Sequence, residues 1–291
     1  MKWGKTVSAG VRGNHIRAVL LMLSACTAYP ALAQEGDAQA KKSKPVAADD
    51  ATVLAPITVK SAGQDGATRG YQPVSTTTAT RSDTPLIDIP QAVNIVSQDV
   101  LKDQKAQSLD DALSNISGIN QSNTLGGTQD SVIRRGFGDN RDGLILTNGF
   151  KTALPRSFNA TTERVEVLKG PASTLYGILD PGGMVNVITK KPQQMFGGEI
   201  YGSTSSFGGG TTGLDFTGPI KDTDFAYRLI GEYKNVDYWR NFGKTKDWII
   251  SPSLSWYGED TEVTLSYMHE DYSVPFDRGT IFDLNTGHAV N

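Results

Sequence analysis

The clearest pattern of hydrophobic and polar positions lies after residue 196, where apolar and polar side chains alternate. In the clearest segment, the residues on one face are Phe225, Tyr227, Leu229, Gly231 and Tyr233, and those on the other are Ala226, Arg228, Ile230, Glu232 and Lys234. This period of two is typical of strands. It predicts about five strands, at 198–206, 210–218, 224–236, 247–257 and 261–272. An apolar face, a polar face and aromatic residues near the strand ends favour strands that span a bilayer, with a soluble sandwich as the alternative.

A second pattern, at 161–191, predicts two short strands around a helical turn. Val165 and Val167 alternate with other residues in the first strand, and Val185 and Val187 do so in the second. Between the strands, Gly177 supplies the positive φ that ends a helical turn. Without further information, any small α+β module with a glycine-proline turn would fit this pattern.

The amino-acid sequence of this stretch is more specific than its alternation of apolar and polar residues. It contains ERVEVLKGPASTLYG followed by PGGMVNVITKKP. These motifs resemble the end of the plug domain of TonB-dependent outer-membrane receptors, specifically those that take up ferric siderophores. The resemblance implies an α+β plug domain at 76–191, followed by the start of an antiparallel transmembrane β-barrel at 192–291. Receptors of this family have 22 barrel strands, so we expect the chain to be the N-terminal part of a longer receptor.

The remainder of the plug also has local structural signals. Residues 88–96 predict a strand, and Ser97 with Asp99 predicts the start of a helix. Ser108 begins a second capping arrangement, and Gly118 is expected to close that helix after Ile116.

The first 33 residues predict a signal peptide. Basic residues precede an apolar stretch, and Ala31-Leu32-Ala33 forms a small-residue cleavage site. Residues 1–33 hold four of the 28 basic residues and none of the 31 acidic ones, so the mature chain would carry 24 basic against 31 acidic residues. This acidic balance argues against nucleic acid as a partner. The single cysteine, Cys26, lies within the leader, where it could also be lipidated, so no disulfide is expected in the mature chain.

A short β-prone island lies in the polar linker at 34–75. Residues 53–60 read VLAPITVK, and their unpaired backbone groups could add to the edge of another sheet. The island resembles the TonB box, which the periplasmic domain of TonB captures by strand addition. The expected TonB-binding residues are Leu54, Ala55, Pro56, Ile57, Thr58 and Val59. An apolar linker is the alternative interpretation.

The candidate ligand-binding residues come mainly from loops of the plug that the resemblance directs toward arriving ligand. The segment at 150–159 mixes cationic, apolar and aromatic side chains, a combination suited to a bulky anionic or carbonyl-rich chelate. The candidate ligand-binding residues are Arg135, Lys151, Leu154, Arg156, Phe158, Phe276 and Arg278.

The sequence contains no arrangement of residues typical of an enzyme or a metal site. Its three histidines form no metal-ligand spacing, and no nucleophile-base motif occurs, so we expect neither an enzyme nor a protein-bound cofactor. Iron would arrive already chelated, as a ferric siderophore.

The resemblance further implies two partners besides the siderophore: TonB with its inner-membrane proton-driven motor, and outer-membrane lipid. The stretch SVPFDRGTIFDLNTG at 273–287 resembles hydroxamate-type siderophore receptors more than catecholate ones. Receptors for haem, vitamins or sugars are alternatives within the family. An adhesin or simple porin is an alternative outside it.

Overall fold

The computed structural model describes residues 70–138, 145–151, 154–240, 243–277, 279 and 286–288. The chain divides into two units, Met1–Thr58 and Val59–Asn291. The predicted signal peptide, the predicted TonB box and Arg278 lie outside the described residues.

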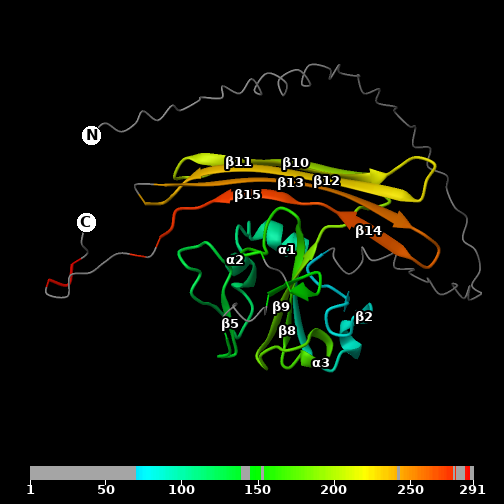
Figure 1. The fold of residues 1–291 in the computed structure, drawn as a ribbon, viewed down its shortest axis with the longest axis horizontal. Helices are drawn as coiled ribbons and strands as arrows, with labels where there is room; N and C mark the ends of the chain where they lie inside the picture. The colour runs from blue at the N-terminus through cyan, green and yellow to red at the C-terminus, as the bar shows by residue number, and fades with distance from the viewer. Residues whose placement is uncertain are drawn as a thin grey trace, which may run out of the picture. The chain divides into compact units, whose positions relative to one another are not determined.

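The plug is built on a five-stranded sheet with the strand order β3-β8-β9-β6-β7 (Figure 1). Its strands are β3 (Ala92–Val96), β6 (Ile145–Thr147), β7 (Phe150–Lys151), β8 (Thr162–Lys169) and β9 (Gly183–Thr189). β6 and β9 pair in parallel, and the other pairs are antiparallel. The predicted strand, helical turn and strand at 161–191 are thus β8, α3 (Ser173–Tyr176) and β9, with Gly177 at φ 77°.

Both faces of the central sheet are buried, because alternate residues of β8 and β9 enter different clusters. Val165 and Val167 pack with Val185 and Val187 in one core. Leu168 packs with Met184 and Leu146 in the other. This period-two division is what a strand dictates.

Two short helices cover the first core. α1 (Gln98–Asp103) and α2 (Leu109–Leu113) begin after Ser97 and Ser108, whose side chains accept hydrogen bonds from backbone amides, as expected. α2 ends at Leu113 rather than at Ile116, although Gly118 does adopt the expected positive φ. The smaller elements of the plug are β1 (Ser75–Thr76), β2 (Thr84–Pro85), η2 (Leu86–Asp88), β4 (Ile119–Gln121) and β5 (Val132–Arg134).

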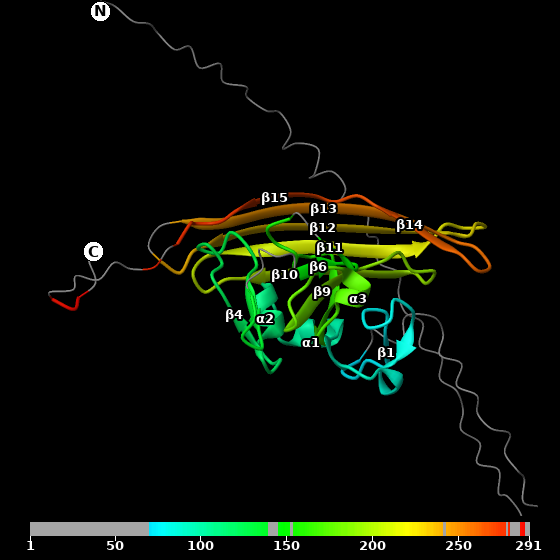
Figure 2. The ribbon, with the colours of Figure 1, turned by 60° about the horizontal axis from the view of Figure 1, so that its bottom comes forward.

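The strands after the plug form an antiparallel sheet, which we call the wall. It comprises β10 (Gly197–Thr204), β11 (Gly209–Pro219), β12 (Phe225–Asp237), β13 (Lys244–Tyr257), β14 (Glu262–Ser266) and β15 (His269–Ser273). Neighbours along the chain pair from β10 to β14, and β15 also pairs with β13 (Figure 2). The five predicted strands therefore appear with one difference, since the last is divided into β14 and β15.

The division of the last strand has a cause in its neighbour. Tyr267 lies opposite Pro252 of β13, and proline has no N–H to donate to the ladder. The Tyr267 carbonyl instead accepts a hydrogen bond from Ser251 Oγ at 3.0 Å. The prediction of one continuous strand at 261–272 was wrong because it did not consider the partner strand.

The two faces of the wall differ as the alternation predicted. The large side chains on one face that remain exposed include Tyr227, Leu229, Trp248, Ile250, Leu254, Trp256 and Leu265. The other face carries buried polar side chains, including Asp215, Thr217, Arg228 and Ser255. Among the described residues, no helix is both long enough and apolar enough to cross a membrane.

Candidate ligand-binding site and plug-to-wall contacts

Residues 151–158, from the end of β7 onward, include four of the predicted ligand-binding residues, and the structure gives them different surroundings. Lys151 and Leu154 are exposed, and Lys151 Nζ donates to the carbonyl of Ile178 at 3.2 Å. Arg156 is half-buried, and its guanidinium lies 4.1 Å from the ring centroid of Tyr272 in β15 and donates to the Tyr272 hydroxyl. Phe158 is half-buried and packs against the first core of the plug. Arg156 and Phe158 therefore also position this segment.

A buried carboxylate joins this segment to the loop before β5. Asp130 Oδ2 accepts from the Ser157 backbone N–H at 2.6 Å, and the Asp130 N–H donates to the Pro155 carbonyl at 2.8 Å. Burial raises the pKa of Asp130, although the hydrogen bond from Ser157 opposes this shift. Sequence reasoning did not identify Asp130.

Arg135 is exposed at the end of β5, in a left-handed conformation with φ 50°. Its neighbour Arg134 is completely buried, with NH2 4.0 Å from Asp180 Oδ2. Alternate residues of a strand lie on the same face, and β5 places Val132 and Arg134 on its buried face. The apolar residue at position 132 therefore indicated that Arg134, not Arg135, is the buried arginine.

Phe276 is exposed, next to a carboxylate that connects two segments of the wall. Asp277 accepts from Tyr238 Oη at 2.8 Å and forms an ion pair with Arg240 Nε at 3.0 Å. The Gly279 backbone N–H, followed by the Tyr238 hydroxyl, holds the pKa of Asp277 below its usual range. The predicted ligand-binding residues thus fall in at least three places: directly after β5, from the end of β7 to residue 158, and after β15.

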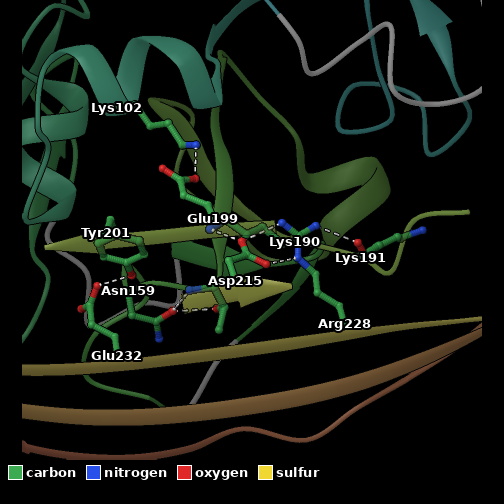
Figure 3. Close-up of polar contacts among 10 residues, drawn as sticks. Lys102, Asn159, Lys190, Lys191, Glu199, Tyr201, Asp215, Arg228 and Glu232 are labelled. Carbon is green, nitrogen blue, oxygen red and sulfur yellow. Dashed lines mark hydrogen bonds and ion pairs between the residues drawn. The ribbon is translucent and has the colours of Figure 1, made fainter. Parts of the chain in front are cut away.

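The strongest polar cluster that sequence reasoning missed lies where the plug meets the wall (Figure 3). Asp215 of β11 accepts two hydrogen bonds from Arg228 of β12, both at 2.8 Å, and lies 2.9 Å from Lys190 Nζ. Burial lowers the pKa of Lys190, against the opposing effect of Asp215. Sequence alternation placed Arg228 on the polar face of its strand, but only the strand register brings it to Asp215.

A polar cavity of about 480 Å³ lies between the plug, residues 191–194 and Tyr257 of β13. Its lining includes Ser75, Thr76, Arg81, Arg164, Asn186, Lys191, Gln194 and Tyr257. None of the predicted ligand-binding residues that the structure describes contributes to this lining. Within the described part of the chain, no group of three or more His, Cys, Asp or Glu side chains could hold a metal ion.

Comparison with known proteins identifies this arrangement. Residues 85–184 match the family model of the TonB-dependent receptor plug domain. The metal-pseudopaline receptor CntO of Pseudomonas aeruginosa is 36% identical over 232 residues, covering 79% of this chain and 33% of CntO. This chain belongs to the TonB-dependent receptors. The predicted fold class, a plug followed by the start of a barrel, is confirmed.

Other relatives of this TonB-dependent receptor are named for different ligands. The ferrioxamine B receptor of Salmonella typhimurium is 31% identical over 231 residues, covering 73% of this chain and 33% of that receptor. The closed crystal form of the ferric-catecholate import receptor Fiu from Escherichia coli has a TM-score of 0.59 at 28% identity, covering 75% of this chain and 30% of Fiu. The chain thus spans about a third of the length of the relatives it matches. These proteins are receptors, in agreement with the expectation that the chain is not an enzyme.

Proposed function

We propose that this chain forms part of an outer-membrane receptor that takes up a ferric siderophore with energy supplied through TonB. The observation that carries the proposal is the combination of a plug with a wall whose apolar side chains face outward and whose polar side chains contact the plug. Such a wall suits a barrel in lipid, and a plug inside it would prevent free diffusion. The three relatives described above, each named as a receptor for a metal chelate or siderophore, support the same conclusion.

The parts of the chain would act in order. Residues 1–33 direct export, and residues 53–60 in the linker pair with TonB by strand addition. The proton-driven motor of the inner membrane then acts on the plug at 76–191. The iron remains bound to its chelate throughout, so the receptor requires no cofactor of its own.

The proposed ligand contacts are the seven predicted residues, with distinct roles suggested by their surroundings. Arg135, Lys151, Leu154 and Phe276 are exposed and available to touch the chelate directly. Arg278 is proposed from the sequence alone. Arg156 and Phe158 are expected to act partly through the position of the 154–158 segment, because they contact Tyr272 and the plug core.

We further propose a preference for hydroxamate siderophores, supported by the resemblance of the sequence at 273–287 to hydroxamate-type receptors. The competing candidate is a metal chelate of another class, favoured by the 36% identity with the metal-pseudopaline receptor.

Growth of an iron-starved strain tests both the function and the preference. The full-length receptor that carries this chain is expressed in a strain lacking its own receptors, which is then supplied with a ferric hydroxamate, a ferric catecholate or haem. Growth on the hydroxamate is expected. Growth on the catecholate alone would refute the preference, and growth on haem with no response to any siderophore would refute the proposed function.

Energy coupling is tested by Ile57→Pro. Proline removes the backbone N–H that strand addition requires, so uptake should fall to background while ligand binding at the cell surface persists. Ile57→Ala is the matched control, because it shortens the side chain but keeps the N–H. Continued uptake by Ile57→Pro would show that TonB pairing does not depend on this strand.

A further inference from the structure

The connector between the plug and the wall, residues 190–193, is fixed to the wall by buried charges. It joins β9 of the plug to the segment that leads into β10. Lys190 Nζ lies 2.9 Å from Asp215 Oδ2, and the two side chains are only 10% and 7% exposed. Arg228 holds both oxygens of the same carboxylate in a bidentate pair, the strongest geometry for such a contact.

The main chain of the connector is held as well. Arg228 NH1 donates to the Lys191 carbonyl at 2.9 Å, and Tyr257 Oη donates to the Pro192 carbonyl at 2.6 Å. The Gln193 N–H donates to Thr217 Oγ1 at 2.8 Å. Three successive residues are thus bound through their backbones by side chains of β11, β12 and β13, so the connector cannot shift without breaking several bonds together.

Two other polar contacts between plug and wall are more accessible to water than those of the connector. The ion pair between Lys102 of α1 and Glu199 of β10 joins side chains that are 48% and 45% exposed. Lys234 of β12 donates to Gln107 Oε1 at 3.1 Å in another exposed contact. Exposed contacts of this kind add little to stability. The connector is therefore a firmer attachment between plug and wall than either of these two contacts.

The charge balance makes Asp215 the residue on which this attachment depends. Two cations share one carboxylate, so the loss of Asp215 would leave Lys190 and Arg228 buried without an anionic partner in this cluster. The loss of Lys190 would leave a bidentate pair of zero net charge. The two changes should therefore have unequal effects.

We propose that residues 190–193 are a fixed anchor, which stays bonded to β11, β12 and β13 while the plug N-terminal to it rearranges during transport, with Asp215 as the positioning residue. This inference rests on the proposed uptake function for the part that concerns transport. It divides the plug into a portion that moves and a C-terminal attachment that does not.

Cross-linking in the full-length receptor tests whether the anchor moves. The only cysteine in this chain, Cys26, lies in the predicted leader, so the plug and the wall hold no cysteine that could compete with the introduced pair. A disulfide between Gln193→Cys and Thr217→Cys should leave uptake at the level of the reduced variant. A cleavable thiol-specific linker between Lys102→Cys and Glu199→Cys should reduce uptake to background until it is cleaved. The inference is overturned if the first bridge blocks uptake reversibly, or if neither bridge changes uptake.

Hydrogen exchange tests the attachment even in a receptor that transports nothing. In detergent and rising urea, the amide of Gln193 should stay protected after those of α1 exchange. Asp215→Asn should remove this difference, and Thr217→Val should expose the Gln193 amide if Asp215→Asn fails to fold. Lys244→Ala, at an exposed ion pair elsewhere on the wall, should have no such effect. Exchange of the Gln193 amide before those of α1 in the unmodified receptor would overturn the inference independently of the uptake result.

Discussion

The two ends of the plug are held by different chemistry. At the C-terminal end, the anchor at 190–193 is fixed to the wall by a carboxylate that two cations share. At the N-terminal end, residues 75–81, which we call the strap, are fixed to the plug itself by separate hydrogen bonds and not by a shared carboxylate. The polar cavity is lined by residues from both segments, so the two attachments border the same space.

The strap is held by two buried threonines. Thr76 Oγ1 donates to Glu166 of β8, while Thr78 Oγ1 accepts from Asn186 Nδ2 at 2.9 Å. The Thr78 carbonyl also accepts from Tyr176 Oη at 2.8 Å. A hydrogen bond of this type contributes about 0.5–1.5 kcal/mol, so the strap can be released in small steps. The anchor cannot be released in small steps in this way, because the loss of the Asp215 carboxylate leaves Lys190 and Arg228 buried together.

The largest expected effect is that of Asp215→Asn on the stability of the anchor. It should lower the free energy of unfolding of the plug-to-wall attachment by about 3–5 kcal/mol, since the buried cations lose their shared carboxylate. The urea midpoint for protection of the Gln193 amide measures the change. Lys190→Met is the control, and it should have a clearly smaller effect. Equal losses in the two variants would contradict the assigned charge balance.

The second-largest effect on stability is expected at Glu166, the carboxylate that accepts a hydrogen bond from Thr76 of the strap. Glu166 is fully buried and accepts from Arg164 Nε at 2.6 Å. Glu166→Gln should destabilise the strap by about 2–3 kcal/mol, because Arg164 loses a charged partner while Thr76 keeps an acceptor. Faster tryptic cleavage after Arg81 is the expected readout. Glu163→Gln, at a distance of 3.7 Å from Arg164, is the control and should accelerate cleavage less.

A smaller effect is expected from Thr78→Val. Valine matches the shape of threonine but removes the acceptor of the Asn186 amide, at a cost of about 1–2 kcal/mol. The same tryptic cleavage should accelerate, while protection of the Gln193 amide stays unchanged. Thr80→Val, at an exposed position, is the matched control. Loss of anchor protection in Thr78→Val would show that strap and anchor do not act separately.

These attachments also show what the sequence could predict and what it could not. The alternation around Leu229 predicted 224–236 for a strand found at Phe225–Asp237, because the direction of each side chain is a local property of an extended chain. The break opposite Pro252 depends on the partner strand, so the pattern of 261–272 alone could not reveal it.

The candidate site was harder to predict than the strands, because it depends on register and phase. Asp215 pairs across the sheet with Ile230, while Arg228 is the partner of Thr217, so their ion pair is diagonal and requires a known register. Arg134 and Arg135 are neighbours, yet one is fully buried and the other exposed, which only the phase of β5 decides. Arg156 was predicted from its chemistry, but its contact with Tyr272 joins residues 116 positions apart.

The smallest expected effect is a pH dependence at Asp130, which lies outside both attachments and tests whether they are independent of the 154–158 segment. Burial raises the folded pKa of Asp130 above its ordinary value of 3.8, so the folded protein holds the proton more tightly than the unfolded chain does. Its contribution to stability is therefore present at low pH and is lost as pH rises through the raised pKa. Asp130→Asn keeps an oxygen to accept the Ser157 N–H but does not titrate.

In the unmodified receptor, protection of the Ser157 amide, corrected for its intrinsic exchange rate, should fall as pH rises from about 4 toward 7, by about 1 kcal/mol or less in the free energy of local opening. In Asp130→Asn this dependence should be absent, while the Gln193 amide should behave alike in both proteins. A parallel pH dependence in the two proteins would assign the titration to another group. A change at the anchor would show that the 154–158 segment and the C-terminal attachment are energetically coupled.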